Sequence, residues 1–293
     1  MASVIQSPYR GGQKVALMCP PAHFDVKYAI NPQMKAALER GVRVDKNRAF
    51  LQWMRLAFLL QTFGVEVRYI LSPKKTPDMV FAANAGFPFN GRVAISHFRH
   101  TERRKEEPYF ARFFRKQLGM RAKDVIASHA FHPEFFEGKG DVLWHEDTLV
   151  CGYGLRSTRK GIEAVLEAVG YTGKRVFLEL VDERFYHLDT CLCLSGKYIL
   201  WYPPAFRPEA WKVVSDLVPP GGFSIIVSEE DALEFACNGI FLENGGKKHL
   251  ITSPVSPRLR GTLQDLGITV HENDVSEFLK AAGGNQCLVL FLN

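Results

Sequence analysis

A recurrence of about 50 residues constrains the fold of this chain more than any other feature of its sequence. A polar residue repeatedly stands just ahead of a short apolar stretch that is typical of a β-strand, and a turn and second strand follow. These polar residues are Asn84, Glu137, His187, Asn238 and Cys287, and their separations are 53, 50, 51 and 49 residues. A period of this length indicates repeated supersecondary units that pack side by side around an axis.

The fifth unit is incomplete in the sequence, because residues 288–293 (LVLFLN) are not followed by a second strand. Residues 14–20 (KVALMCP) form a free strand candidate of suitable length. We therefore expect one α/β domain over residues 1–293, built as a ring of five units and closed by pairing of these two strands. The alternative is an ordinary open α/β sheet with coincidental spacing, since the units share no residue identity.

Strand-like and helix-like segments alternate along the whole chain, and no linker or low-complexity segment divides it. Further strands are expected at residues 67–71, 92–96, 147–154, 197–203, 223–227 and 249–255, and helices at 48–64, 106–119, 159–170, 256–267 and 275–284.

Composition argues against several classes of function. The N-terminus has no apolar leader and no apolar run approaches the roughly 20 residues of a membrane span, so we expect a cytoplasmic protein. The six cysteines lie in apolar stretches, which favours reduced thiols over disulfides. The net charge is +6, but the basic residues are scattered and form no nucleic-acid-binding motif. A small-molecule substrate is therefore expected, and the sequence leaves a homo-oligomer open.

If the ring forms, the five leading polar residues converge on one central cavity. A thiol becomes a good nucleophile only when a base or a positive charge lowers its pKa. A histidine can supply that help and later protonate a leaving amine, while a carboxylate fixes the tautomer of the histidine. Cys287, His187 and Glu137 can fill these three roles, which predicts a cysteine-dependent hydrolase or transferase.

The segment FYHLDTCLCL at residues 185–194 is typical of one extended strand, in which His187, Asp189, Cys191 and Cys193 share a face. This pattern lacks the paired-loop spacing of zinc sites, so no metal is expected. We expect the two cysteines to be small core residues and His187 and Asp189 to face the cavity.

Several stretches resemble the guanidine-modifying superfamily, which comprises arginine deiminases, amidinotransferases and dimethylarginine dimethylaminohydrolases. The motifs FFEGKGD, FYHLDT and GGNQC carry this resemblance. The stretches MCPPAHFDVKYAINPQM, TPDMVFAANAGF, DERFYHLDTC and YPPAF are similar to the catalytic domain of bacterial arginine dihydrolases. The resemblance spans nearly the whole chain and implies the pentein fold, an α/β propeller of five units.

The resemblance also implies roles for individual residues. Cys287 would be the nucleophile and His187 the general acid and base, oriented by Glu137. Asp189 would hold the guanidinium nitrogens of the substrate.

Three further residues match positions around the substrate in this family. Arg103, in FRHTER, would pair with the substrate α-carboxylate, and Asn31, in AINP, would make a second contact there. The alternatives are a solvated surface charge for Arg103 and a turn residue for Asn31. Asp141 would either contact the substrate or shape its own loop.

Asn84 departs from the deiminase pattern. Deiminases carry F-T-R-D, whose aspartate grips the guanidinium, whereas the aligned stretch here is Phe81-Ala82-Ala83-Asn84. An amide both donates and accepts hydrogen bonds, whereas a carboxylate only accepts them. Asn84 could therefore bind a ureido group as well as a guanidinium, so that citrulline stays bound and reacts again.

The expected function is hydrolysis of arginine to ornithine, ammonia and carbon dioxide, through S-amidino and S-carbamoyl intermediates and without a cofactor. A dimethylarginine dimethylaminohydrolase, an arginine deiminase that stops at citrulline, and an amidinotransferase remain alternatives, because all use the same triad. A non-catalytic binding protein is the alternative of a different class, because penteins include a ribosome-binding translation initiation factor.

Overall fold

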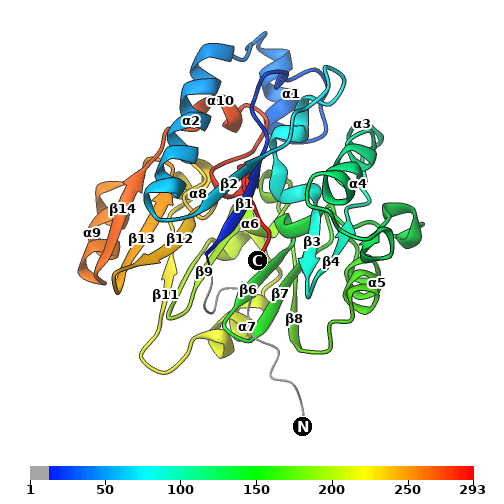
Figure 1. Cartoon of the computed structure of the whole chain (residues 1–293). Coiled ribbons are helices and arrows are strands. Elements are labelled where there is room, and N and C mark those ends of the chain that lie inside the picture. The colour runs from blue at the N-terminus through cyan, green and yellow to red at the C-terminus, as the bar shows by residue number, and fades with distance from the viewer. Residues whose placement is uncertain (1–12) are drawn as a thin grey trace.

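The five units of the chain each form a small mixed sheet (Figure 1). The computed structural model describes residues 13–293. In every sheet the central strand pairs antiparallel with the first strand and parallel with the third. The four sheets that are continuous in sequence are β3(Gly86–Phe89)-β4(Arg92–Ile95)-β5(Val125–Ile126), β6(Val142–His145)-β7(Thr148–Tyr153)-β8(Lys174–Glu179), β9(Leu192–Ser195)-β10(Tyr198–Trp201)-β11(Phe223–Ile226) and β12(Ile240–Asn244)-β13(Lys247–Thr252)-β14(Ile268–Glu272).

The fifth sheet joins the two ends of the described chain and confirms the predicted closure. It consists of β15(Leu290–Phe291), β1(Val15–Met18) and β2(Glu66–Tyr69), in that order. Leu17 of β1 lies opposite Leu290 of β15, and both side chains are fully buried. Because β15 takes the place of the first strand and β1 that of the second, this sheet repeats the plan of the other four.

Short helical turns ahead of the first strands come together at the centre of the molecule. They are η2(Ala82–Ala85), η5(Gly138–Gly140), α6(Leu188–Cys191) and η8(Gln286–Leu288). Each contacts the next, and η8 contacts η2, so that they close a cycle. Four of the five polar residues of the 50-residue repeat lie in or next to these turns, and the fifth, Asn238, bonds to Cys287, so the ring brings the five residues to one place.

The longer helices lie at the periphery, around the strands (Figure 1). In α2(Lys46–Thr62) the Asp45 side chain caps the first turn, and Trp53, Leu56 and Leu60 are buried on one face. The remaining helices are α1(Pro32–Glu39), α3(Thr101–Arg104), α4(Glu107–Lys116), α5(Arg159–Val169), α7(Ala210–Leu217), α8(Glu229–Leu233), α9(Pro257–Asp265) and α10(Ser276–Leu279).

One predicted helix is much shorter than expected. The segment 275–284 is helical only in α10, because Ala282 adopts the left-handed backbone conformation with a φ of 57°. The chain then passes so close to Phe81 that a Cβ at Gly283 would lie 2.1 Å from its ring. This turn redirects the backbone toward η8 and Cys287.

The prediction of one extended strand over residues 185–194 is wrong, because α6 interrupts it and β9 begins only at Leu192. The Asp141 carboxylate accepts the backbone N–H of Leu188, and the Thr190 hydroxyl donates to the His187 carbonyl, which together stabilise the turn. The turn, rather than strand alternation, therefore places His187 and Asp189. Cys191 and Cys193 are buried in the core, as predicted.

None of the helices within residues 13–293 is long and apolar enough to cross a membrane. The expectation that the chain carries no N-terminal leader depends on residues 1–12, which lie outside the described residues.

Candidate active site

His187 and Glu137 form a buried pair at the centre of the ring. The Nε2 of His187 lies 2.8 Å from Oε2 of Glu137, which also accepts from Nη1 of Arg156 at 3.1 Å. The other carboxylate oxygen accepts the backbone N–H of Arg99. Burial alone would raise the pKa of Glu137, but the Arg156 guanidinium and the His187 hydrogen bond hold it well below its usual range. Glu137 is therefore an ionised carboxylate that fixes the orientation of the imidazole.

Cys287 lies beside Asp189 in the same buried region. Its Sγ is 3.4 Å from Oδ2 of Asp189, and both residues are almost completely buried. Burial and the neighbouring carboxylate raise the pKa of the Cys287 thiol well above its usual value. Burial also raises the pKa of Asp189 to about 7. The second oxygen of Asp189, Oδ1, has no hydrogen-bond partner among residues 13–293, which leaves an acceptor available to a cationic ligand.

The backbone, rather than a direct bond, links the His187–Glu137 pair to the Cys287–Asp189 pair. His187 immediately precedes α6 and Asp189 lies in its first turn. Within the described chain no hydrogen bond joins His187 to Cys287. The imidazole and the thiol are thus bonded to different carboxylates, that of Glu137 and that of Asp189.

Asn84 and Arg103 form a third buried pair, which contacts the His187–Glu137 pair. Asn84 donates from Nδ2 to the backbone oxygen of Glu137 and accepts from Nη1 of Arg103, each at 3.0 Å. Two further donors of Arg103 bond both carboxylate oxygens of Glu106 at 2.9 Å. Arg103 is only 3% exposed, which excludes the alternative of a solvated surface charge. These bonds position Asn84, and the contact of Arg103 with the substrate α-carboxylate stays a prediction.

Asn31 caps helix α1. Its Oδ1 accepts the backbone N–H of Met34 at 2.8 Å, while Nδ2 donates to the Tyr186 hydroxyl and the carbonyl of Ala281. The residue therefore ties the start of α1 to the segment that leads into Cys287.

Asp141 shapes the loop around the site. It accepts from the Ser157 hydroxyl at 2.6 Å and from the backbone N–H of Leu188 at 3.1 Å. Burial raises its pKa to about 6. Of the two roles left open for Asp141, these contacts support the structural one, because they fix the backbone next to His187.

Two charged residues near the site were not identified from the sequence. The Arg156 guanidinium lies over the Tyr186 ring at 4.1 Å and donates to the carbonyl of Ile30 at 2.7 Å. Asp78 is buried, accepts the Tyr28 hydroxyl with one oxygen, and has no partner for the other within residues 13–293. Single charges inside the apolar stretches TPDMVF and CGYGLRS were the only available signal.

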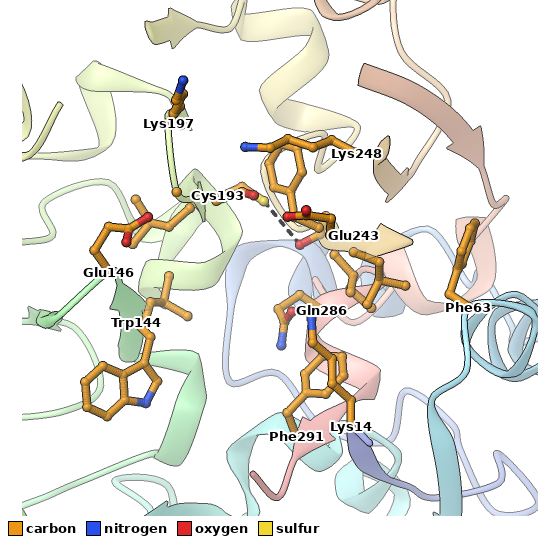
Figure 2. Close-up of a pocket in the computed structure, with 18 of the residues that line it drawn as sticks. Lys14, Phe63, Trp144, Glu146, Cys193, Lys197, Glu243, Lys248, Gln286 and Phe291 are labelled. Atoms are coloured by element: carbon orange, nitrogen blue, oxygen red, sulfur yellow. Dashed lines mark hydrogen bonds between the residues drawn. The ribbon is translucent and has the colours of Figure 1, made fainter. Parts of the chain in front are cut away.

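A cavity of about 860 Å³ borders this region (Figure 2), and its lining does not include Cys287, His187 or Glu137. Its exposed lining carries Glu146 and Lys197 from hairpin turns, Lys248 of β13 is half-buried, and Asp189 belongs to the buried lining. Gln286, the neighbour of Cys287, also lines it (Figure 2). The described residues contain no group of three or more His, Cys, Asp or Glu side chains placed to hold a metal ion.

Known proteins are similar to this chain in both sequence and structure. The family model for eukaryotic N,N-dimethylarginine dimethylhydrolase matches residues 20–292. The bifunctional arginine dihydrolase/ornithine cyclodeaminase ArgZ of Synechocystis is 39% identical over 94% of this chain, which spans 37% of that relative. An N(G),N(G)-dimethylarginine dimethylaminohydrolase of Mycobacterium tuberculosis is 33% identical over 93% of this chain and 84% of its own length.

The solved N-terminal domain of ArgZ has the same fold. Its substrate-bound form superposes with a TM-score of 0.85 at 38% identity, covering 96% of this chain and 98% of that one. The product-bound form gives a TM-score of 0.86. The predicted α/β pentein fold and the predicted superfamily are therefore confirmed. The chain belongs to the dimethylarginine dimethylaminohydrolase family, within the guanidine-modifying superfamily.

Proposed function

We propose that this chain is a cysteine-dependent hydrolase that converts arginine to ornithine, two molecules of ammonia and carbon dioxide. The observation that carries the proposal is the buried thiol of Cys287 beside Asp189, whose second oxygen has no hydrogen-bond partner within residues 13–293. A guanidinium is planar, cationic and rich in N–H donors, so it satisfies that oxygen and neutralises the carboxylate. The same cation removes the charge that opposes formation of the thiolate.

The first round of the proposed reaction gives citrulline. The Cys287 thiolate attacks the guanidinium carbon, and His187 carries the thiol proton to the departing nitrogen, which leaves as ammonia. Glu137 stabilises the imidazolium that forms in between. Water then attacks the S-amidino carbon, the C–S bond breaks, and the thiol is restored.

The second round consumes citrulline at the same site. The thiolate attacks the ureido carbon, the C–N bond to the terminal nitrogen breaks, and this nitrogen leaves as ammonia after His187 protonates it. Water attacks the S-carbamoyl carbon, the C–S bond breaks, and the ornithine carbamate that forms decomposes to ornithine and carbon dioxide. The balance is arginine plus two waters to ornithine, two ammonia and one carbon dioxide. No cofactor or metal enters either round.

Asn84 supports the second round. Arg103 and the Glu137 carbonyl hold its amide in one orientation, and each of its polar atoms keeps one further bonding site. The amide can therefore accept from the nitrogen of a guanidinium and donate to the oxygen of a ureido group.

Charges complementary to an amino acid lie near the site. Arg156 is a buried cation beside Glu137, and Asp78 has one buried oxygen without a partner in the described part of the chain. We propose that they supplement the roles assigned to Arg103 and Asn31 in holding the α-carboxylate and α-ammonium groups of arginine.

We further propose that residues 1–293 act as one catalytic domain in the cytoplasm, alone or as a homo-oligomer. All six cysteines are unpaired, which suits a reducing compartment. The relatives named bifunctional carry additional length that this chain does not cover.

Hydrolysis of dimethylarginine is the second candidate function. The family model and the mycobacterial relative both bear that name. Mass spectrometry of products from arginine, citrulline and dimethylarginine separates the two functions. Ornithine from arginine supports the dihydrolase, citrulline without ornithine contradicts it, and dimethylamine from dimethylarginine identifies the second candidate.

Two variants sharpen this test. Cys287→Ala should form no product and no covalent adduct from any of the three substrates. Asn84→Asp should accumulate citrulline, because an aspartate cannot donate to the ureido oxygen and would place an oxygen against the Glu137 carbonyl. Asn244→Asp, at the exposed end of β12, adds the same charge away from the site and should leave the products unchanged. Unaltered ornithine output from Asn84→Asp would exclude the proposed role of the amide.

A further inference from the structure

Asn238 is the polar residue of the fourth unit, and both polar atoms of its side chain form hydrogen bonds to Cys287 or Asp189. Its Nδ2 donates to Sγ of Cys287 at 3.2 Å and to the backbone oxygen of Asp189 at 2.9 Å. Its Oδ1 accepts the backbone N–H of Cys287 at 3.1 Å. The side chain is fully buried, so water does not compete for these bonds.

The backbone of Asn238 adds a third bond to the segment that contains Cys287. The carbonyl of Asn238 accepts the N–H of Gln286 at 3.0 Å. A Cβ at Gly284 would lie 2.7 Å from Oδ1 of Asn238, so the glycine allows the close approach. Asn238 therefore fixes the turn that presents Cys287, at both the main chain and the sulfur.

Two polar side chains contact the sulfur, and they favour opposite protonation states. The Asp189 carboxylate accepts a hydrogen bond from the thiol, which it can do only while the proton is present. Asn238 donates to the sulfur, and a hydrogen bond from a neutral donor strengthens when the acceptor becomes charged. Asn238 is thus placed to compensate for the negative neighbour when Cys287 loses its proton.

We propose that Asn238 is a further active-site residue, which holds Cys287 in place and donates a hydrogen bond to its thiolate during attack on the substrate. This inference depends on the proposed role of Cys287 as the nucleophile. It does not depend on which guanidino compound is the substrate, because the contacts involve only the sulfur, its backbone and Asp189.

The test is the pH dependence of Cys287 alkylation by iodoacetamide, followed by mass spectrometry of the peptide that contains Cys287. Asn238→Asp keeps the size and the oxygen that accepts the Cys287 N–H, but removes both N–H donors and adds a charge. The alkylation midpoint should rise by about one to two pH units, the range expected for a hydrogen bond to a charged group. On arginine, kcat should fall while KM changes little.

Asn244→Asp is the matched control, and the midpoint pH of its Cys287 alkylation should equal that of the wild-type protein. Asn238→Ala removes the donor without adding charge, and it should raise the midpoint by a smaller amount. It replaces Asn238→Asp if circular dichroism shows that the aspartate variant does not fold. An unchanged midpoint in a folded variant overturns the inference. Absence of arginine turnover in the wild-type protein would instead contradict the proposed function. The shift in the pH dependence of Cys287 alkylation would still be measured in that case.

Discussion

The Nη1 of Arg103 lies 3.0 Å from Oδ1 of Asn84, so that a buried ion pair controls the orientation of an amide at the centre of the ring. Both carboxylate oxygens of Glu106 accept hydrogen bonds from the same guanidinium. Burial raises the pKa of Glu106 to about 7 despite the arginine beside it. Arg103 and Glu106 therefore position the amide of Asn84.

Replacement of Arg103 by lysine should disturb Asn84 while keeping the charge. A lysine cannot reproduce the two-pronged bond to Glu106 and still reach Asn84, so stability should fall by roughly 2 kcal/mol. The fraction of product released as citrulline should also rise. Denaturant unfolding and product analysis measure the two effects. Arg104→Lys, at the next residue, is the control, and wild-type product ratios in Arg103→Lys would contradict the proposed linkage.

Glu137→Gln should impair catalysis more than binding. The amide no longer stabilises an imidazolium at His187, so kcat should drop about 10²–10⁴-fold with a smaller change in KM. The variant also leaves the buried Arg156 without its carboxylate, which should lower the melting temperature. Steady-state kinetics and thermal unfolding test both points. Glu134→Gln, near the surface in the same loop, should affect neither, and a normal kcat for Glu137→Gln would remove this residue from the mechanism.

Asp189→Asn should stabilise the protein in a pH-dependent way. The pKa of this carboxyl is about 7 in the folded protein, against about 3.9 for an unperturbed aspartate, so the folded state binds the proton more tightly. Its ionisation therefore costs stability that is absent below pH 4, grows as the pH rises, and is complete above pH 7. The gain in unfolding free energy for Asp189→Asn should thus be larger at pH 8 than at pH 4.

Denaturant unfolding at several pH values measures this gain, and an equal gain at both pH values would show that Asp189 is not perturbed. The same variant should lose arginine turnover, because an amide cannot neutralise the guanidinium.

Leu290→Ala should weaken the closure of the ring. Leu290 is fully buried opposite Leu17, so truncation should cost about 2–5 kcal/mol of unfolding free energy. Leu71, just after β2 in the same unit, is 77% exposed, and its replacement by alanine should cost less than about 0.5 kcal/mol. Denaturant unfolding of the pair compares the two sites. Equal effects would mean that the β1–β15 contact contributes little.

Pairs of residues about 50 positions apart show how far the sequence alone could go. The repeat predicted that Glu137 and His187 would meet, and the structure joins them at 2.8 Å. It also predicted the pairing of the chain ends, because a strand without a partner exposes backbone groups that must be satisfied. These features are visible in a sequence because apolar alternation, turns and spacing are local properties repeated in register.

The tertiary structure decided the partners of individual side chains. Arg156 reaches the carbonyl of Ile30 across 126 residues, and Arg103 donates to the amide oxygen of Asn84. The helical turn that places His187 and Asp189 depends on Asp141, 47 residues before Leu188. Such contacts produce no repeating pattern in the sequence. Each depends on where a whole unit packs and on which buried donors still need an acceptor. The sequence by itself thus determined the ring and the residues that lead its units, whereas only packing decided which of their atoms face one another.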